Sequence, residues 1–210
     1  MADKKGRCVV LAGGPIRAEE LRLLRPGDTV WAADAGLKAA RRAGLVPELC
    51  LGDWDSCEQP RDAKELIALP AEKDDTDTHH AARLIAERGF AEALLLGCLG
   101  GRLDHTLANL STLLYLTGQG VRCWLVGADA AVTALHSGSL RLPRRPECYF
   151  SVFAAAGEAR GVTLRGMKYP LDRALVTEQF PIGVSNEILQ ETGEVTVENG
   201  TLLLVYSKRE

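Results

Sequence analysis

Long apolar runs are missing from this chain of 210 residues. The longest, residues 93–99, has the length of a strand, whereas a helix that spans a bilayer needs ~20 apolar residues. The first residues also lack the apolar core and cleavage pattern of a secretion signal. We therefore expect a soluble, cytoplasmic protein with no membrane partner.

The chain has no excess of basic charge either. Twenty-five Lys and Arg face 28 Asp and Glu, for a net charge of −3, and nucleic-acid binders usually carry a clustered basic excess. The six cysteines include no C-x-x-C pair and are spread along the sequence, so we interpret them as free thiols. With 46% apolar and 25% charged residues, the composition excludes disorder and collagen-like fibres. These features predict a globular protein with no nucleic-acid partner.

The common nucleotide-binding and catalytic signatures are absent too. There is no G-x-x-x-x-G-K-[ST] loop, no G-x-G-x-x-G fingerprint, no G-x-S-x-G nucleophile turn and no protein-kinase motif set. His79, His80 and His105 lack the spacing of zinc ligands. Any nucleotide site in this chain must therefore be built in another way.

The first two thirds of the chain alternate apolar runs with helical patterns. This alternation predicts a mostly parallel sheet with helices on its faces. The expected strands are residues 8–12, 29–33, 48–51, 93–97 and 122–126, and the expected helices are residues 18–24, 37–43, 78–88 and 106–117.

The pattern changes after about residue 143 to short β-type runs with no long helical pattern. Asn199-Gly200 between two of these runs predicts a hairpin, and the proline-rich residues 142–146 resemble a linker. We therefore expect an α/β domain over residues 1–145 and a small all-β domain over residues 146–210. The expected strands of the second domain are residues 149–154, 161–164, 194–198 and 201–206.

Acidic residues recur directly after the expected strands of the first domain. They occur in Ala33-Asp34-Ala35-Gly36, in Gly52-Asp53-Trp54-Asp55-Ser56 and in Gly100-Gly101-Arg102-Leu103-Asp104-His105, with Lys73-Asp74-Asp75-Thr76-Asp77 just before a helix. Open parallel sheets bind ligands at this edge. Carboxylates that meet there repel one another unless a cation is present, and oxygen ligands favour Mg²⁺. The glycine pair and Arg102 suit phosphate, so the residues themselves predict a Mg²⁺ and phosphate site.

Each motif also has a purely structural interpretation. Thr76 or Asp77 can cap the following helix, and Asp34 can serve in an ordinary turn. The glycine pair can be there for packing, and Lys73 can be an exposed lysine. These alternatives stay open for each motif taken alone.

Taken together and in order, the motifs resemble the thiamine pyrophosphokinase family. Gly166-Met167-Lys168-Tyr169-Pro170-Leu171 and Gly183-Val184-Ser185-Asn186-Glu187 are similar to further signatures of that family, so the resemblance covers nearly the whole chain. Two departures are small, since the family usually has glycine in place of Ala35 and often phenylalanine in place of Trp54.

The resemblance implies a Rossmann-like α/β nucleotide domain followed by a β-sandwich. It implies transfer of the β,γ-pyrophosphoryl group of ATP to the hydroxyl of thiamine, in a homodimer whose active sites are shared between chains. On this basis the expected Mg²⁺ ligands are Asp53, Asp55 and Asp77, and Asp104 is expected to orient the thiamine hydroxyl or accept its proton. The expected ATP-binding residues are Asp34, Lys73, Asp74, Thr76, Gly100, Gly101 and Arg102, and the expected thiamine-binding residues are Ser185 and Asn186.

Two other functions remain open. One is a related pyrophosphokinase that acts on a pterin alcohol. The other is a nucleotide- or thiamine-binding regulator without turnover, which the number of acidic motifs disfavours because a sensor needs fewer metal-binding carboxylates. Without the resemblance, a tight turn after Gly183 would be the preferred interpretation of Ser185 and Asn186.

Overall fold

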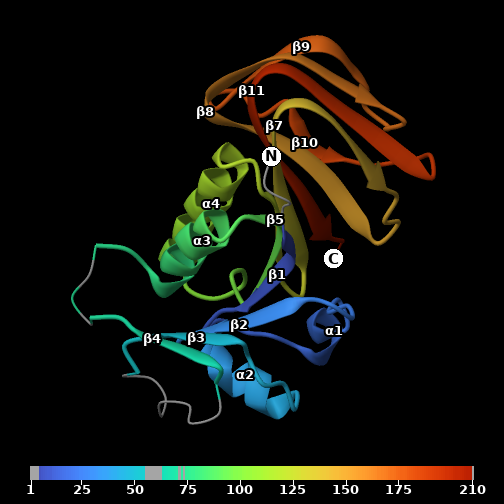
Figure 1. The fold of residues 1–210 in the computed structure, drawn as a ribbon. Coiled ribbons are helices and arrows are strands. Elements are labelled where there is room, and N and C mark those ends of the chain that lie inside the picture. The colour runs from blue at the N-terminus through green and yellow to red at the C-terminus, as the bar shows by residue number, and fades with distance from the viewer. Residues whose placement is uncertain (1–4, 55–62, 71, 73, 210) are drawn as a thin grey trace. The chain divides into compact units, whose positions relative to one another are not determined.

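A computed structural model describes residues 5–54, 63–70, 72 and 74–209 of this mixed α/β chain. The chain divides into two compact units, Met1–Ala128 and Asp129–Glu210 (Figure 1). This division into compact units falls between Ala128 and Asp129, and the expected functional domains, residues 1–145 and 146–210, stay a prediction. No helix within the described residues is long and apolar enough to cross a membrane.

The first unit contains a parallel sheet in the strand order β6-β5-β1-β2-β3-β4. The expected strands all occur, and β2 and β6 have the predicted bounds. Strand β4 was missed by the sequence reasoning, because its apolar run, Leu66-Ile67-Ala68, is very short and the strand is mostly exposed. The bounds are β1 Lys5–Leu11, β2 Thr29–Ala33, β3 Leu49–Gly52, β4 Glu65–Ala68, β5 Phe90–Leu96 and β6 Arg122–Val126.

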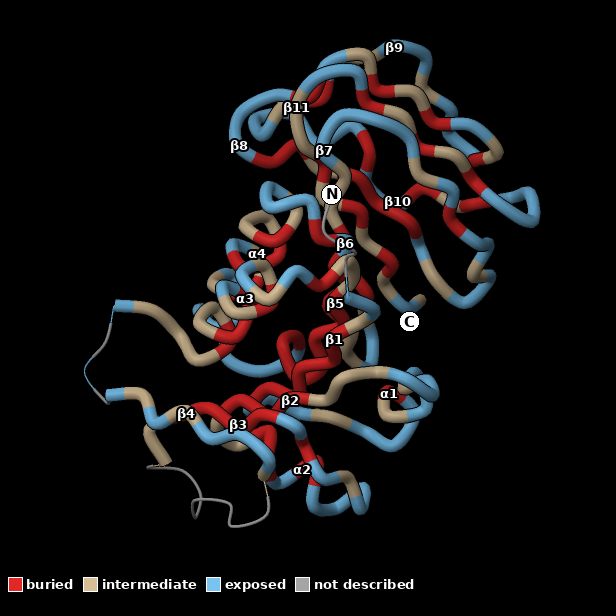
Figure 2. Tube along the Cα trace, viewed as in Figure 1, coloured by how far each residue is buried: buried red, intermediate tan, exposed pale blue. Residues whose placement is uncertain are grey.

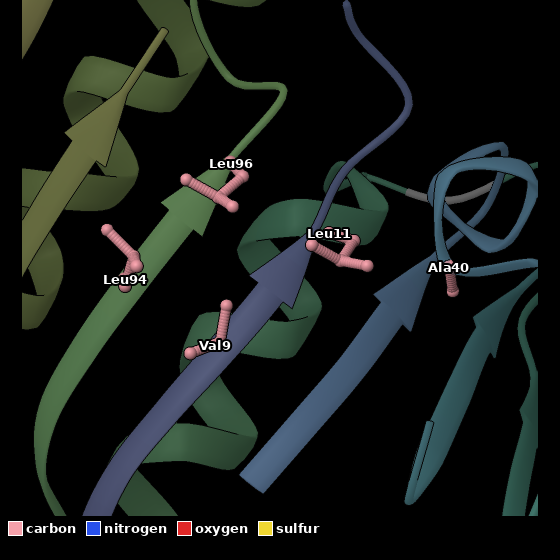
Figure 3. Close-up of a cluster of buried hydrophobic side chains, with 5 residues drawn as sticks. All are labelled: Val9, Leu11, Ala40, Leu94 and Leu96. Atoms are coloured by element: carbon pink, nitrogen blue, oxygen red, sulfur yellow. The ribbon is translucent and has the colours of Figure 1, made fainter. Parts of the chain in front are cut away.

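Helices cover both faces of this sheet. Figure 1 shows α3 (Asp77–Glu87) and α4 (Leu103–Gly118) together on one side, with α1 (Ala18–Leu21) and α2 (Gly36–Arg42) on the other. Alternate side chains of β1 and β5 point to the same face and pack with Ala40 of α2, as Figure 3 shows for Val9, Leu11, Leu94 and Leu96. The buried residues of the unit concentrate in its central strands (Figure 2). This packing holds the C-terminal ends of these strands in place, and the candidate site lies there.

Ion pairs connect strands of this sheet to neighbouring segments. The Arg7 guanidinium contacts Asp28 at 2.6 Å, and both side chains are largely buried. At the edge strand, Arg88 donates two hydrogen bonds of 2.7 and 2.6 Å to Glu65 and lies 5.1 Å from the ring of Trp31. Arg88 thereby ties β4 to the C-terminal end of α3.

The second unit is antiparallel, with the pairing order β10-β8-β11-β7 and with β9 paired to β8. Its three longest strands each extend beyond the usual strand length. The bounds are β7 Ala130–Pro143, β8 Cys148–Arg165, β9 Leu171–Thr177, β10 Gly183–Asn186 and β11 Thr192–Lys208.

Two local expectations for this unit are wrong. Asn199-Gly200 is no hairpin, because β11 continues through it with a bulge between Val197 and Thr201. A Cβ on Gly200 would lie 2.5 Å from the Glu158 carbonyl oxygen, so glycine is needed here for close approach of two strands. The expected linker 142–146 is instead the end of β7 and the turn into β8.

Candidate active site

A pocket of about 450 Å³ lies at the carboxyl ends of the parallel strands of the first unit. Strand β1 has β2 on one side and β5 on the other, so the strand order reverses there, and open α/β sheets bind ligands at such a point. The first turns of α3 and α4 complete the wall. The lining residues are Ala12, Gly13, Gly14, Ala33, Asp34, Thr76, Asp77, Thr78, Gly97, Cys98, Gly101, Arg102, His105, Thr106 and Asn109.

Glycine backbone forms the part of the wall between β1 and β5. The Gly14 N–H donates to the Gly97 carbonyl at 3.0 Å, and a Cβ on Gly14 would lie 2.3 Å from that oxygen. Gly97 has a φ of +74°, and a Cβ there would lie 2.7 Å from the Ala12 carbonyl oxygen. Side chains are therefore excluded at both positions, so backbone forms this part of the wall, with Gly14 exposed and Gly97 buried.

Asp34 stands directly after β2 in a left-handed conformation with a φ of +47°. Its N–H donates to the Leu51 carbonyl at 2.8 Å, and its side chain lines the pocket. Gly36 allows α2 to begin beside β1, since a Cβ on Gly36 would lie 1.9 Å from the Leu11 carbonyl oxygen. The sequence Asp34-Ala35-Gly36 therefore turns the chain sharply and places Asp34 in the site.

The acidic motif after β3 lies partly within the described residues. A Cβ on Gly52 would lie 3.2 Å from the Asp34 Cα, so the end of β3 passes next to Asp34. Asp53 follows Gly52 and is half-buried, but it is not among the residues that line the pocket. Asp55 lies outside the described residues.

The N-terminus of α3 bears on the two interpretations of Thr76 and Asp77, as helix-capping residues or as residues of a binding site. Thr76 is the capping residue, because its Oγ1 accepts a hydrogen bond of 3.1 Å from the His79 N–H. Asp77 is the first helical residue, and both residues line the pocket. Asp74 is exposed and outside the pocket lining, and Lys73 lies outside the described residues.

The N-terminus of α4 presents Arg102 to the pocket. Gly100 precedes it with a φ of +78°, and Gly101 lines the pocket. Arg102 donates to Asp104 at 2.6 and 3.2 Å. This hydrogen bond lowers the pKa of Asp104 below its ordinary value. Asp104 is exposed and, like Gly100, is not among the lining residues.

A polar stripe on α4 was missed by the sequence reasoning. His105, Thr106 and Asn109 follow Arg102 at helical spacing and all line the pocket. Asn109 is buried, and its Nδ2 donates to the Cys98 carbonyl at 2.9 Å. Burial raises the pKa of the Cys98 thiol to about 12, so this pocket cysteine is no nucleophile at neutral pH. The polar residues recur at i, i+3, i+4 and i+7, a spacing that predicts one face of a helix. This pattern could have indicated the stripe, but only the apolar residues of the helix were used to predict it.

The described residues contain no group of three or more His, Cys, Asp or Glu side chains arranged to hold a metal ion. Asp34 and Asp77 nevertheless bring carboxylates to one pocket. Mg²⁺ usually takes one or two carboxylates, with the rest of its oxygen ligands from phosphate and water. The donor set therefore fits Mg²⁺ in the presence of a phosphate ligand.

The expected thiamine residues lie on β10 of the second unit. Ser185 is exposed with a φ of +57°. Asn186 is only 2% exposed. Its Oδ1 accepts hydrogen bonds from the Tyr169 N–H at 2.9 Å and the Glu187 N–H at 2.8 Å, and its Nδ2 donates to the Tyr169 carbonyl at 2.7 Å. The two neighbours thus differ, since Ser185 is open to solvent and Asn186 is committed to the backbone.

Comparisons with known proteins identify the family of this chain. Residues 21–125 match the family "Thiamin pyrophosphokinase, catalytic domain", and residues 139–203 match "Thiamin pyrophosphokinase, vitamin B1 binding domain". The thiamine pyrophosphokinase of Bacillus subtilis is 28% identical over 94% of this chain and 97% of its own length.

Solved structures are similar over almost the whole chain. The thiamin pyrophosphokinase of Geobacillus thermodenitrificans has a TM-score of 0.84 at 26% identity, covering 98% of each chain. A thiamin pyrophosphokinase family protein of Enterococcus faecalis has a TM-score of 0.81 at 28% identity, covering 97% of this chain and 100% of its own. From the two matched domains and these full-length relatives, the chain belongs to the thiamin pyrophosphokinase family.

Proposed function

We propose that this protein transfers the β,γ-pyrophosphoryl group of ATP to the hydroxyl of thiamine, giving thiamine diphosphate and AMP. The observation that carries the proposal is the match to both domains of the family, in order, on one chain. The pocket supports it, because a glycine-lined switch point with two helix N-termini and an arginine suits a polyphosphate.

In this proposal the nucleotide occupies the pocket of the first unit. The backbone at Gly14, Gly97 and Gly101 and the first turns of α3 and α4 face its phosphates, and the Arg102 guanidinium adds positive charge. Asp34, Asp74 and Thr76 contact the nucleotide, as do Lys73 and Gly100. Thr76 does so while capping α3, which fixes its backbone.

Mg²⁺ is the proposed cofactor, with Asp53, Asp55 and Asp77 as its protein ligands and Asp34 beside them. When bound, it neutralises charge on the triphosphate and on the reacting phosphorus. Asp104 is proposed to orient the thiamine hydroxyl or accept its proton. The Arg102 hydrogen bond lowers the pKa of this carboxyl and so makes it a weaker base, which favours orientation over proton transfer as its role.

The second unit is proposed to bind thiamine, with Ser185 and Asn186 at its site. We assign the ATP and Mg²⁺ role to residues 1–145 and the thiamine role to residues 146–210. In the same proposal the first domain is Rossmann-like, the second is a β-sandwich, and the protein is a cytoplasmic homodimer. Each active site then combines the first unit of one chain with the second unit of its partner.

One assay tests the reaction. The protein is incubated with ATP, Mg²⁺ and thiamine, and the products are identified by mass. Equal amounts of AMP and thiamine diphosphate are expected. ADP with thiamine monophosphate as main products would contradict pyrophosphoryl transfer, AMP release only with a pterin alcohol would change the substrate, and calorimetric binding without AMP would indicate a regulator.

A further inference from the structure

Ser185 occupies a bulge in strand β10. Gly183 pairs with Val152 and Asn186 pairs with Phe150, so β10 uses one residue more than β8 between the two pairs. Ser185 takes the left-handed conformation within this bulge and its side chain is exposed. A Cβ on Gly183 would lie 2.1 Å from Val152 Cγ2, so β10 enters the bulge pressed against β8. Bulges of this kind redirect a side chain, and they are common beside functional sites.

Two buried polar side chains hold the bulge from either side. Ser151 on β8 is 5% exposed, and its Oγ accepts the Ser185 N–H at 3.0 Å. Asn186 ties the other side to Tyr169, at both the N–H and the carbonyl of that residue. The remaining N–H of the Asn186 amide faces the Met167 sulfur at 3.8 Å. The polar atoms of Asn186 are therefore engaged within the unit.

The residue type at position 185 adds a third observation. A left-handed conformation suits glycine, and Gly157, Gly161 and Gly200 take such conformations in the same unit. Ser185 keeps a side chain at a position where one is strained, and that side chain is a hydroxyl open to solvent. Strained residues held by their surroundings cluster at ligand sites.

We propose that Ser151 and Asn186 are positioning residues that hold Ser185 in its bulge, so that the Ser185 hydroxyl contacts the alcohol substrate. This inference rests on the proposed function, and it changes the role of one predicted residue. Asn186 acts through the backbone around it, whereas Ser185 makes the contact. The aminopyrimidine of thiamine, with ring acceptors and an amino donor, suits a hydroxyl that both donates and accepts.

The same unit contains a matched control. Thr163, also on β8, accepts a hydrogen bond of 3.1 Å from the N–H of Arg173, which has a φ of +48° on β9. A β8 hydroxyl thus accepts the N–H of a left-handed residue on β9 as well as on β10. Thr163→Val and Arg173→Gly disturb this second arrangement without touching Ser185.

The experiment measures the thiamine dissociation constant by calorimetry, the KM of both substrates, and the thermal midpoint. Ser151→Ala leaves the Ser185 N–H without its acceptor and is expected to weaken thiamine binding about tenfold, the scale of one unsatisfied buried group. The KM for ATP should not change. Ser151→Cys, whose sulfur is a weaker acceptor, should give an intermediate loss.

Ser185 itself supplies a second test that does not depend on Ser151. Ser185→Gly and Ser185→Ala both remove the hydroxyl, so both should weaken thiamine binding. The glycine variant should melt above the alanine variant, because only alanine keeps the strain. Thr163→Val and Arg173→Gly should bind thiamine as the wild type does.

The outcomes are separable. Wild-type affinity in folded Ser151→Ala or Ser185→Gly overturns the inference, as does an equal loss in Thr163→Val. If the wild-type protein binds no thiamine, the proposed function itself is wrong. That result is obtained before any variant is made, so it is distinguishable from a failure of this inference.

Discussion

The two units present their proposed functional groups in opposite ways. In the first, Asp34, Thr76, Asp77 and Arg102 stand where regular strands end or helices begin, and the strands themselves are undistorted and parallel. In the second, Ser185 sits within a strand, at a bulge with a left-handed residue. Strand ends are marked in a sequence by glycine and polar residues, whereas a bulge depends on what the neighbouring strand supplies. The first kind of site is therefore much easier to predict.

The largest expected effect concerns the carboxylates of the first unit. Asp77→Asn should lower turnover by about 10²–10³-fold, the scale of losing one preorganised charge at a transition state. Asp53→Asn and Asp55→Asn should behave alike. None should unfold the protein, because removing charge from a repelling cluster does not cost stability.

Asp28→Asn is the matched control on the same unit, since it removes a structural carboxylate paired with Arg7. It should keep the turnover of the wild type. Near-normal activity of the Asp77, Asp53 and Asp55 variants at saturating Mg²⁺, measured by AMP release, would disprove the metal assignment.

The next prediction asks whether the two kinds of site work across chains. Asp53→Ala should be severely impaired as a pure homodimer, and Asn186→Ala should be impaired when thiamine is kept well below its raised KM. If sites are shared, refolding the two together gives mixed dimers with one site doubly altered and one intact, so activity should return to about half of the wild type per mixed dimer. If mixed dimers form and stay inactive, each site is built within one chain.

A smaller effect separates the substrates. Asn186→Ala leaves the Tyr169 and Glu187 N–H groups without their acceptor and should raise the KM for thiamine about tenfold, with little change for ATP. Steady-state kinetics with each substrate varied in turn provides the measurement. A large rise for ATP beside an unchanged KM for thiamine would reverse the assignment of the two units.

The last prediction concerns a change that leaves turnover as in the wild type and alters stability in a pH-dependent way. Burial raises the pKa of Asp28, but hydrogen bonds from Arg7 and from the Arg25 N–H outweigh it, so the pKa is lowered overall. A carboxyl with a lowered folded-state pKa stabilises the fold above its unfolded pKa of about 3.9, and that stability is lost as pH falls through the folded value.

Asp28→Asn should therefore lower the free energy of unfolding by about 2 kcal/mol at pH 7. The difference from the wild type should shrink below about pH 4. Urea unfolding at both pH values is the measurement, and a pH-independent difference would show that the charge of Asp28 is not what stabilises the fold.

The same contrast between strand ends and strand neighbours explains which parts of the fold the sequence predicts. Strands β2 and β6 could be placed to the residue because buried parallel strands are continuous apolar runs. The edge strand β4, Glu65–Ala68, carries too little apolar sequence to be recognised. Asn199-Gly200 indicated a turn, although its glycine serves a close approach between strands. Sequence reveals local chemistry and periodicity, but it does not reveal which backbone lies across the next strand.

The strand order also determines when each edge of β1 gains its neighbouring strand during synthesis. β1 gains β2 as a partner once residue 33 has been made, yet its other edge stays open until β5 is complete at residue 96. Because the glycine-lined pocket lies along that second seam, a nascent chain that stops before β5 carries an unpaired, apolar β1 edge and an incomplete pocket. Such open edges invite association with other chains. Closing the seam therefore both buries this edge and completes the pocket. The proposed nucleotide ligand would bind only the chain that has closed this seam, and its binding would stabilise the completed fold.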